Sequence, residues 1–150
     1  MATAAARDFR AAFDAMREEL ATLPAELADT PWRTGGWTRK QIVGHLMDSA
    51  TNNRQRFVRA SIEGKYTGPS YQQEEWVAAH GYSEQTWDTL LHWWRIEHEI
   101  LAAAVDRIPE EKLKAQCVVG DEQAVSLLFL MEDYWVHQRR HMAQMATGAR

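Results

Sequence analysis

The sequence has few of the features that mark secreted, membrane-bound or disulfide-rich proteins. It contains a single cysteine, Cys117, so no disulfide can form within the chain, which fits a reducing compartment. The longest apolar run, from Val125 to Met131, is far too short to cross a membrane. The first residues carry charges early and lack the apolar core of a secretory signal. We therefore predict a cytoplasmic protein that does not engage a membrane.

An excess of positive charge is also missing. The formal net charge is −4, the basic residues are scattered rather than striped, and no nucleic-acid-binding motif is present. These features argue against a nucleic-acid partner. Repeats, low-complexity tracts and linkers are absent as well, and 150 residues are enough for one domain with a real core. We expect residues 1–150 to form a single domain.

What the sequence does contain is helical periodicity. Apolar residues recur with three-four spacing in four long segments. In the second segment, Thr38 and Gln41 have the spacing of a capping box, and Gly64 is a stop signal. The predicted helices span Ala4–Thr22, Thr38–Glu63, Ser83–Arg107, and a last segment that begins between Asp121 and Ser126 and ends near Gly148. Four such helices predict an all-α protein, a four-helix bundle.

The long connection from Lys65 to Tyr82 breaks this periodicity. We expect it to be irregular, with one short helix between Gln72 and His80. Tyr71 and Trp76 are large residues for a solvated loop, which indicates that the segment folds back over the bundle. Long connections in compact domains are often functional lids, and this one is long enough for a crossover.

Two histidines near the C-terminus, His137 and His141, are four residues apart in the stretch DYWVHQRRHMAQM. On a helix they are separated by about 40°, so both imidazoles can face one ion. The spacing alone is weak evidence, because many such pairs are ordinary polar residues. The pair is in register with Leu127 and Tyr134, however, which predicts that both rings face the bundle interior.

His45 lies on the inward stripe of the second predicted helix in the same way. Three inward histidines from two helices match the three-ligand plan of catalytic metal sites, which keep one position open. In the alternative, these histidines hydrogen-bond to buried carboxylates or carbonyls. We interpret His98, which faces the core by register, as a structural histidine of that kind.

Polar residues follow His45 on the same helix. Asp48 is placed either to accept a hydrogen bond from a ligand histidine or to act as general base. Asn52 and Arg56 are candidates for holding a polar or anionic substrate group. In the alternative, Asp48 and Arg56 form an ion-pair chain on a solvated edge.

Three segments together resemble one known family. GHLMDSATNNRQRF, YQQEEW and YWVHQRRHMAQM occur in the order and spacing of the DinB-like superfamily, and the likeness is greatest to its YfiT-type branch. The resemblance extends from about Trp37 to Met145. It implies a four-helix bundle with a long crossover connection. It also implies a divalent metal (nickel, zinc or iron) held by His45, His137 and His141.

The resemblance further implies an enzyme that acts on a small-molecule substrate. Relatives are described as metal-dependent hydrolases or as S-transferases and isomerases of low-molecular-weight thiols, and many are homodimers. We expect the ion to activate a bound water or a thiol, with Asp48 as catalytic residue. The residues expected to bind substrate are Asn52, Arg56, Tyr71 and Trp76. A non-catalytic metal-binding or stress-associated module and a helical dimerisation protein with structural histidines are the alternatives.

Overall fold

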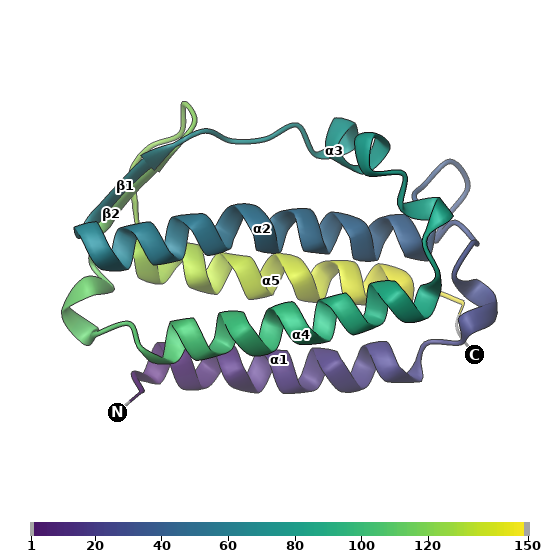
Figure 1. Ribbon diagram of the computed structural model, residues 1–150, viewed down its shortest axis with the longest axis horizontal. Coiled ribbons are helices and arrows are strands. Elements are labelled where there is room, and N and C mark those ends of the chain that lie inside the picture. Colours follow the sequence, from purple (N-terminus) through teal and green to yellow (C-terminus); the bar gives the residue numbers. More distant parts are fainter. Residues whose placement is uncertain (1, 149–150) are drawn as a thin grey trace.

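The computed structural model describes residues 2–148, and four long helices dominate it (Figure 1). These helices are α1 (Ala4–Thr22), α2 (Arg39–Glu63), α4 (Trp87–Asp106) and α5 (Leu127–Met145). The smaller elements are α3 (Gln73–His80) and three short strands, β1 (Lys65–Gly68), β2 (Gln116–Val119) and β3 (Val125–Ser126). The predicted four-helix bundle with a long crossover is confirmed, and a small sheet is added at one end.

Hydroxyl side chains start each long helix. Thr3, Thr38, Thr86 and Ser126 each accept a hydrogen bond from a backbone N–H in the first turn. The capping box of Thr38 is present, with both of its reciprocal bonds. The predicted start of the third long helix at Ser83 is wrong, because Tyr82–Glu84 forms a separate 3-10 turn before Thr86 caps α4. At the other end of the chain, α5 stops at Met145, three residues before Gly148.

In cross-section, the four long helices lie at the corners of a square. α2 and α1 each pack against both α4 and α5, so α1 and α2 lie on opposite corners. Between α2 and α4 the chain crosses over the outside of α2, passes through α3, and returns to the end where α2 began (Figure 1). This crossover makes α2 and α4 run in the same direction, whereas a short loop would have made them antiparallel.

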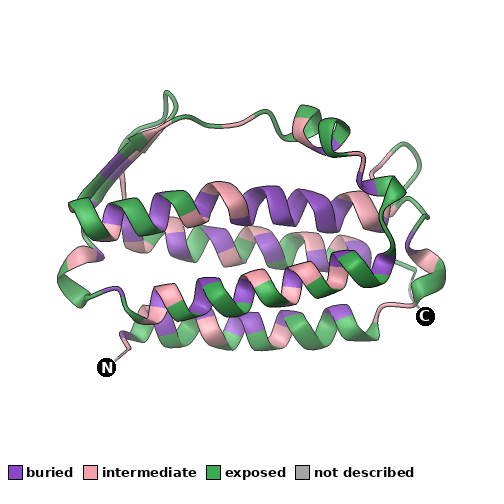
Figure 2. Ribbon diagram, viewed as in Figure 1, coloured by how far each residue is buried: buried purple, intermediate pink, exposed green. Residues whose placement is uncertain are grey.

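The crossover also buries α2 on the side that would otherwise face solvent. All residues from Ile42 to Ala50 are buried, whereas the amphipathic α1 keeps an exposed face (Figure 2). A helix that is buried all round its circumference belongs to the interior of a fold. Polar residues in this part of α2 therefore need partners or a function.

Buried polar bridges join the helices in the core. Gln138 of α5 is fully buried, where it donates to the Leu46 carbonyl oxygen (3.0 Å) and accepts from the Trp94 indole N–H (3.1 Å). His98 is also fully buried, with hydrogen bonds to the Trp94 carbonyl (2.8 Å) and the Tyr134 hydroxyl (2.6 Å). These bonds satisfy His98, as predicted for a core histidine.

The long connection from Lys65, which we expected to be irregular, contains β1, and the connection between α4 and α5 contains β2 and β3. β1 pairs in parallel with β2, and β2 pairs antiparallel with β3. The expectation was wrong because each strand is short, and β1 and β2 pair only when the bundle brings their loops together.

No helix among residues 2–148 combines the length and the apolar character that crossing a membrane needs.

A candidate metal centre and the cavity beside it

Three histidines converge where α2 and α5 pack together. His45 comes from α2, and His137 and His141 come from adjacent turns of α5. The ring nitrogens that they offer lie within 4.8 Å of one another. The sequence-based grouping of these three residues therefore describes a real cluster.

The geometry of the cluster fits a single ion. The Nε2 atom of His137 lies 3.4 Å from that of His45 and 3.2 Å from that of His141. Nitrogen ligands at the usual zinc distance in a tetrahedral site are separated by about 3.3 Å. One shared proton can join only two such nitrogens at a time, whereas one ion can satisfy all three. The donor set suits zinc, nickel or iron.

The protonation states favour ligation as well. Burial, together with the smaller effects of the nearby His141 and His137, lowers the pKa of His45 to about 3. Burial, together with repulsion from His141 and Arg140, lowers the pKa of His137 to about 4. Neutral imidazole is the form that binds metal. At neutral pH, these rings are therefore already in the uncharged form.

A neighbouring side chain orients one of the rings. The Gln144 amide oxygen lies 2.7 Å from His141 Nδ1. An amide oxygen can only accept, so Nδ1 carries the proton and Nε2 keeps its lone pair for the cluster. The Trp37 ring packs on His45 at 4.9 Å between centroids, while His45 Nδ1 is buried without a hydrogen-bond partner among the described residues.

The predicted register of α5 needs a correction. The innermost stripe of α5 contains Tyr134, Gln138 and Met142, whereas His137 and His141 are half-buried on the neighbouring stripe that faces α2. Because the innermost stripe of α5 is displaced by one residue from the histidines, the histidine cluster lies at the edge of the core. A ligand can reach that edge, and it could not reach the centre of a packed bundle.

A cavity of about 230 Å³ adjoins the cluster. His137 forms part of its wall, together with Arg56 of α2 and Tyr71 of the crossover. The other lining residues are Ser49, Asn53, Ser70, Gln73, Val119, Glu122, Leu130, Asp133 and Tyr134. The cavity thus lies between α2, α5 and the returning chain, with a candidate metal ligand in its wall.

Comparison with known proteins agrees with this arrangement. The sequence profile described as "DinB superfamily" matches residues 8–145. The chain belongs to the DinB superfamily.

Two relatives of this chain have names that refer to a metal-dependent hydrolase. A protein of Geobacillus thermodenitrificans named "Putative metal-dependent hydrolase" is 29% identical over 135 residues, which is 89% of this chain and 76% of that protein. A similarly named Bacillus mycoides protein is 39% identical over 71 residues, 40% of this chain. That match covers only 41% of the length of the Bacillus mycoides protein.

A solved structure resembles the fold closely. YfiT from Bacillus subtilis, described as "a probable metal-dependent hydrolase with an unusual four-helix bundle topology", superposes with a TM-score of 0.83. The match covers 94% of this chain and 83% of YfiT, at 21% identity. At that identity the likeness establishes the shared DinB fold.

Asp48 lies apart from the histidine cluster in this DinB-family chain. Its carboxylate is buried, accepts a hydrogen bond from the Tyr82 hydroxyl at 2.5 Å, and lies 3.4 Å from His80 Nδ1. No hydrogen bond among residues 2–148 joins it to a candidate ligand, and its Oδ2 atom has no partner there. The alternative in which Asp48 and Arg56 form an ion-pair chain on a solvated edge is wrong, because both side chains are buried and no ion pair joins them. A catalytic role for Asp48 stays a prediction.

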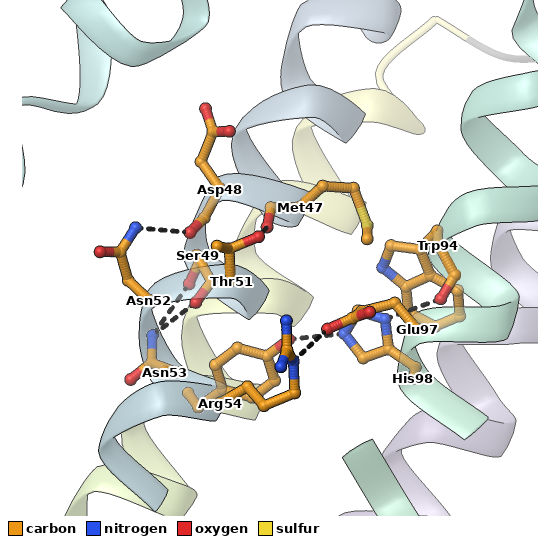
Figure 3. A network of polar contacts seen from close by, with 11 residues as sticks. Met47, Asp48, Ser49, Thr51, Asn52, Asn53, Arg54, Trp94, Glu97 and His98 are labelled. Carbon is orange, nitrogen blue, oxygen red and sulfur yellow. Dashed lines mark hydrogen bonds and ion pairs between the residues drawn. The ribbon is translucent and has the colours of Figure 1, made fainter. Parts of the chain in front are cut away.

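The expected substrate-binding residues divide into two groups. Arg56 and Tyr71 line the cavity beside the cluster. Asn52 instead donates a hydrogen bond to the Asp48 carbonyl oxygen (2.8 Å) and lines a different hollow. Figure 3 shows that the side chains of Asn52 and Asp48 both point away from α4. Trp76 packs edge-to-face on Tyr71, at 5.1 Å between ring centroids, and is not among the residues that line this cavity. Substrate contact by Asn52 and Trp76 stays a prediction.

Sequence reasoning missed several residues that the structure brings to the site. Asp133 lines the cavity one turn before His137 on α5, a spacing that could have drawn attention to it. Gln144 follows His141 by three residues and could have been found in the same way. Tyr82 comes from the far end of the crossover, and nothing local in the sequence connects it to α2.

Proposed function

We propose that this protein is a metal-dependent hydrolase of a small molecule bound in the cavity beside the histidine cluster. The observation that carries the proposal is the convergence of three Nε2 atoms, with His137 also forming part of the cavity wall. An ion held by His45, His137 and His141 would therefore lie next to a bound substrate. The names of the DinB-superfamily relatives support the same reaction class.

The candidate ligands are prepared by their surroundings. Burial keeps the histidines neutral, and Gln144 selects the tautomer of His141 that leaves Nε2 free. A divalent ion, when bound there, supplies Lewis acidity, polarising a carbonyl group and lowering the pKa of water.

Two other residues of the cavity are placed to handle protons. The carboxylate of Asp133 can accept a proton from the attacking nucleophile, since it lines the cavity one helical turn from His137. Burial raises the pKa of Tyr71, so its hydroxyl stays protonated and can donate a hydrogen bond to the substrate. Asp48 is the competing candidate for general base, at a site outside the cavity wall.

Metal content is the first test. Protein purified without chelators or a metal-affinity tag is expected to contain about one equivalent of a first-row metal by elemental analysis. His137→Ala and His141→Ala should lose it. His92→Ala, which alters an exposed histidine of α4, should retain it. Unchanged metal in the first two variants would refute the proposed site.

Turnover is the second test. Metal-loaded protein should hydrolyse members of a panel of small esters and amides. Asp133→Asn should lower kcat by about a hundredfold or more with metal content unchanged. If Asp48→Asn causes that loss and Asp133→Asn does not, the general base is Asp48. Bound metal without turnover of any panel member would favour a non-catalytic metal-binding module.

Other predictions concern the same site and the whole protein. Transfer of a low-molecular-weight thiol, in which the thiol replaces water as the nucleophile, stays a prediction. The same panel tests it when pairs of a thiol and an electrophile are included. The identity of the metal, the homodimer and the cytoplasmic location also stay predictions. Gel filtration with light scattering measures the oligomeric state.

A further inference from the structure

Arg56 is a buried cation without a buried anion to balance it. Arg56 is only 7% exposed, yet no ion pair within residues 2–148 includes it. Its hydrogen-bond partners are neutral oxygens, the Pro69 carbonyl at 3.2 Å and the Asn53 amide at 3.4 Å. A guanidinium carries five N–H donors, so donors remain for another group. Burying such a charge without a counter-ion is costly.

The position of Arg56 directs these donors towards the histidine cluster. Ser49, Asn53 and Arg56 follow His45 at helical spacing along one face of α2, and all three line the cavity. Ser49 and Asn53 are hydrogen-bonded to each other, at 2.9 Å through the Ser49 carbonyl oxygen and 3.2 Å through its hydroxyl. The rise of the helix from His45 to Arg56 is about 16 Å, and side chains on a helix lean towards its N-terminus. Arg56 therefore reaches back towards the candidate metal centre.

The charges at the rim of the cavity restrict which anion fits. Asp133 and Glu122 line the cavity and are exposed. Two carboxylates at the rim disfavour a doubly charged phosphate more than a singly charged carboxylate. The volume, about 230 Å³, lies below the usual range of ligand pockets. A small, singly charged ligand satisfies both conditions.

We propose that Arg56 binds a free carboxylate of the substrate, so that the substrate is a small carboxylic acid with its reacting bond at the other end. A molecule that reaches both Arg56 and the histidine cluster has roughly the size of a short N-acyl amino acid or a dipeptide. Tyr71, Ser49 and Asn53 offer hydrogen bonds to its polar middle. This inference rests on the proposed function, since it takes the cavity to be the substrate site of that enzyme.

The test measures binding and does not depend on turnover. Hippurate, its carboxamide hippuramide and phenyl phosphate are titrated into protein purified without chelators, by calorimetry. Hippurate should bind at least about tenfold more tightly than hippuramide, because a bidentate carboxylate–guanidinium pair is lost in the amide. Phenyl phosphate should bind more weakly than hippurate. Equal binding of hippurate and hippuramide would overturn the proposal, as would preferential binding of phenyl phosphate or no detectable binding of hippurate.

Substitutions locate the binding group. Arg56→Gln should weaken hippurate binding about tenfold or more. Arg59→Gln, which alters an exposed arginine of the same helix outside the cavity, should leave it unchanged. If Arg56→Gln does not fold, Arg56→Lys replaces it, with an expected loss of about threefold because a point charge replaces the planar fork. Wild-type affinity in either folded variant would overturn the proposal.

His141→Ala separates this inference from the proposed function. It removes a candidate metal ligand that is not among the residues lining the cavity. Hippurate binding that survives in His141→Ala and is lost in Arg56→Gln supports the arginine site whatever the metal does. Binding that disappears in His141→Ala and is unaffected by Arg56→Gln means that the carboxylate binds the ion, which overturns the inference while leaving the metal site intact.

Discussion

Replacing Tyr82 with phenylalanine removes one hydroxyl from a buried contact and tests what holds the crossover on α2. The hydroxyl donates to the Asp48 carboxylate at 2.5 Å, and both residues are at most 3% exposed. The other carboxylate oxygen already has no partner among the described residues. The substitution therefore leaves a buried carboxylate whose remaining ion-pair contact among the described residues is with His80, a side chain that is 45% exposed.

The magnitude follows from the cost of leaving a charged acceptor unsatisfied. Such groups cost about 1 to 3 kcal/mol when neutral and more when charged, so we expect Tyr82→Phe to lower the free energy of unfolding by about 2 to 3 kcal/mol near pH 8. For a protein of this size, that loss lowers Tm by about 4 to 12 °C. The phenyl ring can keep its packing against Gly44, so the effect reports the hydroxyl.

The effect should depend on pH. Burial raises the pKa of Asp48, and the hydrogen bond from Tyr82 opposes that rise, followed by the charge of His80. A carboxyl with a raised pKa contributes stability below its ordinary pKa and loses that contribution as pH rises through its pKa in the folded protein. Removing the Tyr82 hydroxyl raises this pKa further. The loss of stability should therefore be larger at pH 8 than at pH 4.

The assay is urea unfolding followed by circular dichroism at both pH values, with metal removed from every sample because metal binding would shift stability. Asp48→Asn in the same background should make the cost of Tyr82→Phe smaller and independent of pH, since the side chain can no longer ionise. Tyr66→Phe, at another buried tyrosine, is the matched control. An equal cost at pH 4 and pH 8, or a cost below about 0.5 kcal/mol, would refute the reasoning.

Three further predictions concern neighbouring contacts. Gly44→Ala should destabilise the protein by about 1 to 3 kcal/mol in urea unfolding, because a Cβ there would lie 2.0 Å from the Tyr82 ring; a gain in stability from the better helix former would contradict this packing. Gln144→Leu should weaken metal binding about tenfold to a hundredfold in a chelator competition, since it frees the His141 ring to rotate and change tautomer; unchanged affinity would show that the amide has no orienting role. Arg39→Met should lower the free energy of unfolding by about 2 to 4 kcal/mol and speed amide hydrogen exchange at the end of α5. The reason is that the buried Arg39 guanidinium donates hydrogen bonds to carbonyl oxygens at the end of α5 and in the segment before α2. Exchange protection equal to that of the wild type would exclude this anchoring.

Local signals accounted for most of the helices. Thr38 with Gln41, and Gly64 at the other end, marked both ends of α2, because capping depends on residues within one turn. The start of α4 was misplaced because Ser83 and Thr86 are both acceptable caps, and the backbone around Tyr82 decides between them. The strands were missed because β1 and β2 pair across about fifty residues of chain, which no local pattern reports.

The candidate site follows the same division. The sequence by itself determined that His45, His137 and His141 belong together, through helical spacing and the order of three motifs. Only the tertiary structure decided that Asp48 faces Tyr82 and that Asn52 turns away from the cavity. These outcomes depend on how the crossover lies on α2, and that arrangement results from packing between segments far apart in the chain. Periodicity places a side chain on a face of its helix, and the element that covers that face determines what the side chain can do.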